Sequence, residues 1–114
     1  MAEEILVARD GVVATVTLNN PAKLNAVNAS MWRRLRTVME ELSADESLRC
    51  IVLRGAGEKA FAAGGDLEEF LILRDTLERA LVYHEEWVAS ALNAIRDCLH
   101  PTVALIQGAC IGGG

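Results

Sequence analysis

Apolar residues at the start of the chain form two short runs separated by a turn signal. Residues 4–9 and 12–18 are rich in Val, Ile, Leu and Thr, and they flank Asp10-Gly11. A two-residue Asp-Gly step between such runs is typical of a β-hairpin. The sequence therefore predicts a hairpin here, with partial burial on both sides because Val12 and Val13 cannot share a face.

The period changes to that of a helix after an Asn-rich loop, residues 19–28, that holds Pro21. Apolar residues then recur at steps of three and four: Met31, Leu35, Val38, Met39 and Leu42. Asn28 or Ser30 is a suitable N-cap, and the polar run 43–47 ends the pattern. We expect an amphipathic helix between these limits.

The second half predicts two buried strands and further helices. Residues 50–55 and 102–108 are short apolar runs, typical of strands buried on both faces. Residues 56–65 read as a loop, a helix opens at Asp66, and a longer helix spans residues 76–99 before Pro101. Its apolar stripe comprises Leu77, Leu81, Trp87, Val88, Ala91, Leu92 and Ile95. The order β-β-α-β-α-α-β indicates an α/β fold.

Each predicted buried strand is followed by a glycine-bearing loop. Gly64-Gly65 precedes Asp66, which with Glu69 matches a D-x-x-E form of the capping box, and residues 112–114 are all glycine. Backbone amides near a helix start attract negative charge, and glycine lets them approach a ligand closely. Two such amides on one oxygen would form an oxyanion hole. A simpler interpretation is also open. The glycines can be ordinary turns, and Asp66, Glu68 and Glu69 can be a helix cap and part of a solvated helix face.

A dinucleotide-binding pattern competes for part of this region. Gly55-x-Gly57-x-x-Ala60 follows a predicted strand, as such a fingerprint does. Its helix would start near Glu58 and be cut by Gly64-Gly65 after about two turns, which is short for a strand-helix-strand unit. The pattern is therefore weak evidence for a dinucleotide site.

Composition narrows the function classes. The 114 residues are 52% hydrophobic, which suits one domain or part of one, and the net charge of −5 disfavours nucleic acid or an anionic membrane as a partner. Three cysteines without a C-x-x-C pattern indicate buried thiols, and the isolated His84 and His100 suggest no metal cluster. Neither a signal peptide nor a membrane span is evident, so we expect a cytoplasmic protein.

Three segments together resemble a known family. They read VATVTLNNPAKLNAVN, CIVLRGAGEKAFAAGGDLEEF and HPTVALIQGACIGGG, in this order. They are similar to the enoyl-CoA hydratase/isomerase (crotonase) superfamily from about Val12 onward. The resemblance implies a crotonase-like α/β spiral of ββα turns, with residues 1–114 as the N-terminal part of a single domain. It also implies an acyl-CoA thioester substrate, no bound cofactor beyond the coenzyme A of that substrate, and a homo-trimer or hexamer.

The same resemblance assigns roles to individual residues. Gly65 and Gly113 stand where the family places its two oxyanion-hole amides. The implied coenzyme A contacts are Lys23, Leu24, Ala26, Ala62, Ala63, Gly64, Asp66 and Leu67. Lys23 and Lys59 are implied phosphate partners, although solvated loop lysines are the simpler and preferred interpretation. His84, Trp32 and Trp87 are candidates for an acyl pocket, but the helical spacing of the tryptophans favours core packing.

The implied reaction is hydration of a 2-enoyl-CoA, with isomerisation, carnitinyl-CoA dehydration and thioester hydrolysis as alternatives. In hydratases of the family a glutamate follows the triple glycine shortly and a second acid lies further on. Both positions fall beyond Gly114, so we expect this polypeptide to be catalytically incomplete. A non-catalytic coenzyme A-binding or assembly subunit is the rival interpretation from another class.

Overall fold

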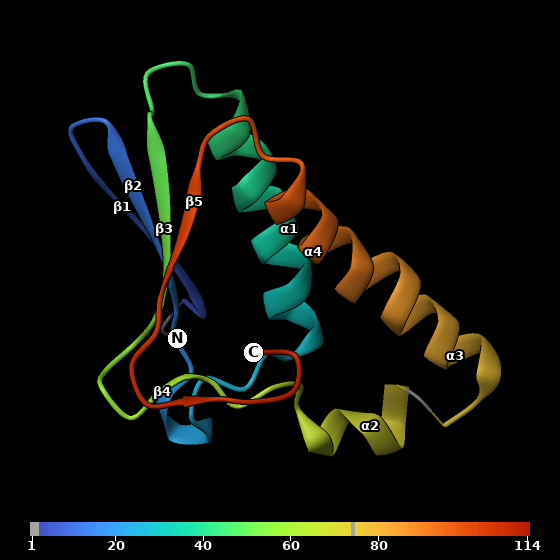
Figure 1. Ribbon diagram of the computed structural model, residues 1–114. Coiled ribbons are helices and arrows are strands. Elements are labelled where there is room, and N and C mark those ends of the chain that lie inside the picture. The colour runs from blue at the N-terminus through green and yellow to red at the C-terminus, as the bar shows by residue number, and fades with distance from the viewer. Residues whose placement is uncertain (1–2, 74) are drawn as a thin grey trace.

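The computed structural model describes residues 3–73 and 75–114, and its main layer is a four-stranded sheet (Figure 1). The strands are β1 (Ile5–Asp10), β2 (Val13–Leu18), β3 (Cys50–Gly55) and β5 (Thr102–Leu105), in the spatial order β1-β2-β3-β5. β1 and β2 are antiparallel, whereas β3 runs parallel to both β2 and β5. The predicted α/β organisation is confirmed.

The predicted hairpin is present as β1 and β2. Asp10 pairs with Val13 and Ile5 with Leu18, and Gly11 takes a positive φ of 61° between the strands. On β2 the buried residues alternate with half-buried ones, so one face of the strand meets the core. Since Val12 is 50% exposed, burial is concentrated on this face rather than shared equally.

Helix α1 (Ala29–Ala44) covers the sheet, and Figure 1 shows it beside α4 (Ala89–Arg96) on the same face. Its N-cap is Asn28, whose Oδ1 accepts a hydrogen bond from the Met31 amide at 2.9 Å. All five predicted apolar positions are buried, together with Ala29 and Trp32. The helical period therefore predicted both the face and the limits of this element.

The long C-terminal helix is divided into three parts: α3 (Leu77–Leu81), a π-helical segment η2 (Val82–Val88) and α4 (Ala89–Arg96). The predicted stripe is partly wrong, because Leu77 is 76% exposed and Leu81 and Leu92 are each 46% exposed. A wider π turn changes the angular position of every residue before it, so the stripe on α3 no longer continues that of α4. No helix in the described part of the chain is long and apolar enough to cross a membrane.

The predicted burial of β3 and β5 on both faces also needs correction. Alternate residues of β3 are only half-buried, and all four residues of β5 are exposed. β5 is the edge strand of the sheet and pairs only with β3 among the described strands, which leaves its side chains in contact with solvent. Cys110 is likewise exposed, whereas Cys50 and Cys98 are half-buried, so the expectation of three buried thiols is wrong for Cys110.

A second, two-stranded sheet occupies a region that the sequence predicts to be loop. β4 (Ala60–Ala62) is buried throughout and pairs in parallel with β6 (Ala109–Cys110). Residue 60 thus begins a strand where the dinucleotide fingerprint needs a helix. The dinucleotide interpretation is therefore wrong, and β4 and β6 lead directly into the two glycine loops.

The loop before α1 contains the 3₁₀ turn η1 (Pro21–Lys23) and is held by one buried side chain. Asn25 is 1% exposed and has a positive φ of 58°. Its Nδ2 donates to the carbonyls of Ala56 and Ala60 at 3.0 and 2.9 Å. Its Oδ1 accepts from the Asn20 amide at 3.0 Å, so one amide side chain joins three separate backbone segments.

Replacing Asn25 by aspartate should destabilise the protein strongly. Asn25→Asp removes both donors and buries a carboxylate against two carbonyl oxygens, which we expect to lower the free energy of unfolding by about 3 kcal/mol. Asn93→Asp is the matched control, because Asn93 is exposed and its side chain makes no hydrogen bond within the described residues. Urea unfolding measures both, and a similar loss in the two variants would contradict the role of Asn25.

Candidate active site

The two glycine loops lie in contact with each other. Gly64 has a positive φ of 98°, and Gly112 one of 55°. A Cβ atom added to Gly64 would lie 3.1 Å from the Ile111 carbonyl oxygen and 3.6 Å from the Gly113 amide nitrogen. The backbone conformation therefore favours glycine at position 64, and a Cβ there would also force the Ile111 carbonyl to shift.

The small sheet brings the loops together. Beyond β4 and β6, the Ile111 amide donates to the Ala62 carbonyl at 3.1 Å, and the Gly114 amide donates back to Ile111 at 2.8 Å. A Cβ on Gly114 would lie only 2.4 Å from the Ala62 carbonyl oxygen. The second loop therefore folds back directly over the end of β4.

The first loop is fixed from its other side by the segment that precedes α1. The Val27 amide donates to the Gly64 carbonyl at 2.8 Å, and the Asp66 amide donates to Val27 at 3.2 Å. The two hydrogen bonds form a parallel bridge between Val27 and Gly65 that takes no hydrogen bond from the Gly65 amide itself. Gly65 is thus held by its neighbours rather than by its own hydrogen bonds.

Several backbone amides remain unused in these loops. Within the described residues, the amides of Gly64, Gly65, Gly112 and Gly113 donate no hydrogen bond to a backbone carbonyl. Gly65 and Gly113, the two positions singled out in the sequence, are among them. Both glycines line an open cavity of about 590 Å³, together with Lys23, Ala26, Ala63, Gly64, Asp66, Leu67, Glu68, Ile111 and Gly112. The arrangement can present two N–H donors to a ligand in this cavity.

The charged side chains of this cavity are paired with one another. The Lys23 ammonium lies 3.0 Å from Glu68 Oε2 and 3.3 Å from Asp66 Oδ2. The hydrogen bond to Glu68, followed by that to Asp66, raises the pKa of Lys23 above its usual value. Lys23 therefore stays charged, and it joins η1 to the start of α2 (Leu67–Leu73).

The predicted capping box is only half present. Asp66 Oδ1 accepts from the Glu68 amide at 2.9 Å, as a cap does. Glu69 does not return to Asp66 but accepts, through Oε1, from the Ala29 amide at 2.8 Å, at the start of α1. Burial raises the pKa of Glu69, and the Ala29 hydrogen bond opposes that rise. Glu69 thus connects α2 to α1.

Gly113 also borders a second, apolar cavity of about 200 Å³. Trp32 forms part of its wall, is 4% exposed, and lies 3.7 Å from the position that a Gly113 Cβ would take. The preference for core packing is confirmed for Trp32, and Trp87 packs against the same core. His84 is exposed and lines neither cavity.

Most of the residues singled out in the sequence meet at the larger cavity. Eight of them line it: Lys23, Ala26, Ala63, Gly64, Gly65, Asp66, Leu67 and Gly113. Leu24 is 45% exposed outside its lining, Ala62 is buried beneath it, and Lys59 is exposed elsewhere. The sequence interpretation gave no role to Ile111, whose placement depends on the unexpected β4–β6 pairing, and it left Glu68 as a residue of a solvated face. Gly112 was predicted only as part of the second glycine loop.

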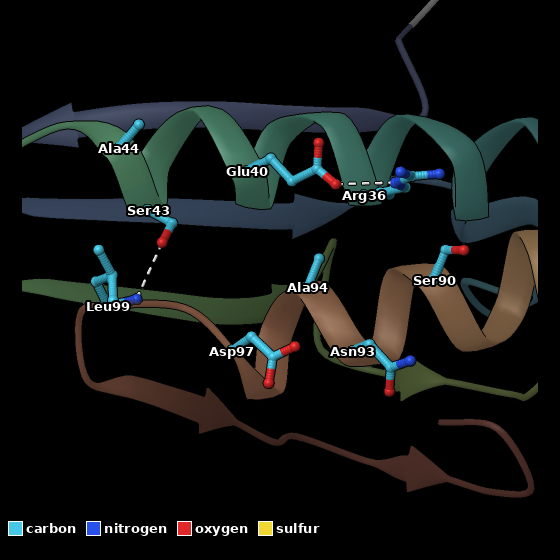
Figure 2. A pocket seen from close by; sticks show the side chains of 9 residues that line it. All are labelled: Arg36, Glu40, Ser43, Ala44, Ser90, Asn93, Ala94, Asp97 and Leu99. Carbon is cyan, nitrogen blue, oxygen red and sulfur yellow. Dashed lines mark hydrogen bonds and ion pairs between the residues drawn. The ribbon is translucent and has the colours of Figure 1, made fainter.

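A different groove lies between α1 and α4, away from the glycine loops (Figure 2). It measures about 460 Å³, and both polar and apolar residues line it. Arg36 pairs with Glu40 at 2.9 Å, and the Ser43 hydroxyl accepts from the Leu99 amide at 3.0 Å. The first contact lies within α1, and the second joins α1 to the segment that follows α4. None of the residues that line this groove lines the cavity at the glycine loops.

Comparison with known proteins identifies a family and a fold. The family model described as enoyl-CoA hydratase/isomerase matches residues 13–114. The chain belongs to this family. A crystal structure of an enoyl-CoA hydratase/carnithine racemase from Magnetospirillum magneticum matches 99% of the chain with a TM-score of 0.94 and 46% identity, which confirms the crotonase-like fold.

Curated relatives carry two kinds of name. The mitochondrial 3-hydroxyisobutyryl-CoA hydrolase of Bos taurus is 37% identical over 99% of this chain, and the putative enoyl-CoA hydratase/isomerase YngF of Bacillus subtilis is 37% identical over 90%. The chain spans 29% and 38% of these two relatives and 42% of the Magnetospirillum structure. The family is therefore established, whereas the reaction is not.

A side chain at position 64 should push the loops of this family member apart. Gly57 and Gly64 both have positive φ, but a Cβ on Gly57 would meet nothing within 4 Å. We expect Gly57→Ala to lower the free energy of unfolding by about 1 kcal/mol, because alanine is strained in this backbone conformation. Gly64→Ala should lower it by at least about 1 kcal/mol more, because its Cβ also contacts the second loop. Urea unfolding measures the difference, and amide NMR shifts at Gly112 and Gly113 should change only in Gly64→Ala. Equal losses in the two variants would argue against the close approach.

Proposed function

We propose that this site belongs to an enzyme that acts on acyl-CoA thioesters, and that the Gly65 and Gly113 amides form its oxyanion hole. The observation that carries the proposal is the meeting of two glycine loops whose amides at these positions make no backbone hydrogen bond within the described residues. Such donors are fixed before a ligand arrives, so little reorganisation is needed when charge develops.

The chemistry of a thioester fits donors of this kind. Addition of water at the β-carbon of an enoyl thioester, or removal of an α-proton, moves negative charge onto the thioester oxygen. Two amides directed at that oxygen stabilise the resulting enolate. Because the donors are backbone groups, no reactive side chain is needed at either glycine.

The reaction we propose is hydration of a 2-enoyl-CoA by the complete protein. The 46% identity to a structure named enoyl-CoA hydratase/carnithine racemase supports this choice. Hydrolysis of a 3-hydroxyacyl-CoA is the second candidate, because several relatives at 34–40% identity are named 3-hydroxyisobutyryl-CoA hydrolase. An oxyanion hole serves both reactions, so it does not distinguish them.

The open cavity is the proposed place of the coenzyme A part of the substrate. Lys23 contributes its positive charge there, and Ala63, Gly64 and Leu67 contribute backbone and apolar surface. Leu24 and Ala62, which lie outside the lining, act in this proposal by shaping the loops. Assembly into trimers or hexamers follows from the family resemblance alone and is proposed on that basis.

A substrate panel tests the reaction. The complete natural protein is offered crotonyl-CoA and 3-hydroxyisobutyryl-CoA, and we expect loss of the enoyl absorbance with the first and little release of free thiol with the second. Thiol release without hydration would transfer the assignment to the hydrolase. Binding of both esters without any product would favour the non-catalytic subunit instead.

Removal of one amide tests the oxyanion hole. Gly65→Pro deletes the N–H donor, and we expect kcat to fall by about 10²–10³. Gly65→Ala is the matched control, because it keeps the amide at the same position and should retain most of the activity. Circular dichroism and coenzyme A affinity check that both variants fold. A folded Gly65→Pro enzyme with full turnover would exclude this role.

A further inference from the structure

The ion pair between Lys23 and Glu68 spans the edge of the open cavity. Lys23 comes from η1, on the N-terminal side of α1, whereas Glu68 comes from α2, after β4. Both residues line the cavity that also holds the glycine loops. The ion pair therefore connects two segments distant in sequence directly beside the proposed coenzyme A site.

The two carboxylates that hold Lys23 differ in their surroundings. The Asp66 side chain is 9% exposed and also accepts the Glu68 amide, so it is fixed in place. The Glu68 side chain is 83% exposed, and its carboxylate makes no contact other than that with Lys23 within the described residues. An exposed pair of this type contributes about 0–1 kcal/mol, so the Glu68 contact is the one that is easily broken.

The charges of this cluster sum to −1, from one ammonium and two carboxylates. Lys23 is the single cation among the described residues that line the cavity. A phosphate that approaches Lys23 therefore meets repulsion from the Glu68 carboxylate, the partner that is exposed and free to move away. An ammonium has three donors, so Lys23 can keep Asp66 and still bind a phosphate oxygen.

We propose that Glu68 competes with the phosphates of coenzyme A for Lys23, so that opening of the Lys23–Glu68 ion pair sets the affinity of the site for the charged end of its substrate. The proposal deepens the proposed function and depends on it. Asp66 holds Lys23 at the cavity in both states, while Glu68 releases it. Glu68 is in this view a residue that determines affinity, and it takes no part in the reaction.

Calorimetric titration with coenzyme A and with pantetheine, which lacks phosphate, tests the proposal in the complete natural protein. We expect Glu68→Gln to bind coenzyme A about three- to ten-fold more tightly, since it removes one competing exposed charge, and to leave pantetheine binding unchanged. Glu41→Gln is the matched control, because Glu41 is an exposed helical glutamate that does not line the cavity and the change in net charge is the same.

Each other result overturns the proposal in a recognisable way. If the unmodified protein binds coenzyme A but Glu68→Gln binds it no more tightly, the competition is excluded and the proposed function stands. Equal tightening in Glu41→Gln, or equal tightening for pantetheine, would mean an effect that does not act through Lys23 and phosphate. If the unmodified protein binds neither coenzyme A nor pantetheine, the proposed function itself fails.

Discussion

The site depends on one steric constraint, the contact between two backbone loops with no room for side chains. Ala62 and Gly64 on one loop meet Ile111 to Gly114 on the other, and a Cβ on Gly114 would lie 2.4 Å from the Ala62 carbonyl oxygen. Parallel pairing of β4 with β6 brings the chain to this point from two distant segments. The cavity at the glycine loops is lined from both segments as a result of that meeting.

The side chain of Asn25 fixes the loop before α1 by hydrogen bonds, in place of pairing between strands. η1 and the segment after it have no strand partner except the bridge at Val27, and Asn25 bonds instead to Asn20, Ala56 and Ala60. Its buried donors and acceptor all have hydrogen-bond partners, which holds the loop in one conformation. This fixed loop in turn brings Lys23 to the carboxylates of α2 and so determines the charge of the cavity edge.

The elements that the sequence predicted well have local signals. Asp10-Gly11 predicted the hairpin and Asn28 the start of α1, because a turn and a cap involve only residues close in the chain. The glycines predicted loops near a ligand, but their meeting required β4, whose three residues carry no strand pattern of their own. Two other features depend on neighbours distant in sequence, so no local pattern shows them. β5 is exposed, and Glu69 accepts a hydrogen bond from the start of α1 instead of capping its own helix.

Gly113 has a particular place, since it borders both the polar cavity and the apolar one. On one side lie Lys23 and its carboxylate partners, and on the other the Trp32 ring, whose Nε1 has no acceptor within the described residues. Apolar surroundings lower the local dielectric response, so an amide at this boundary interacts more strongly with a developing negative charge than one in water. In the proposed function, the charged end of the ligand would meet solvent and Lys23, while the reacting oxygen would meet a donor backed by an aromatic wall. The same glycine loop would then separate the recognition of charge from its stabilisation.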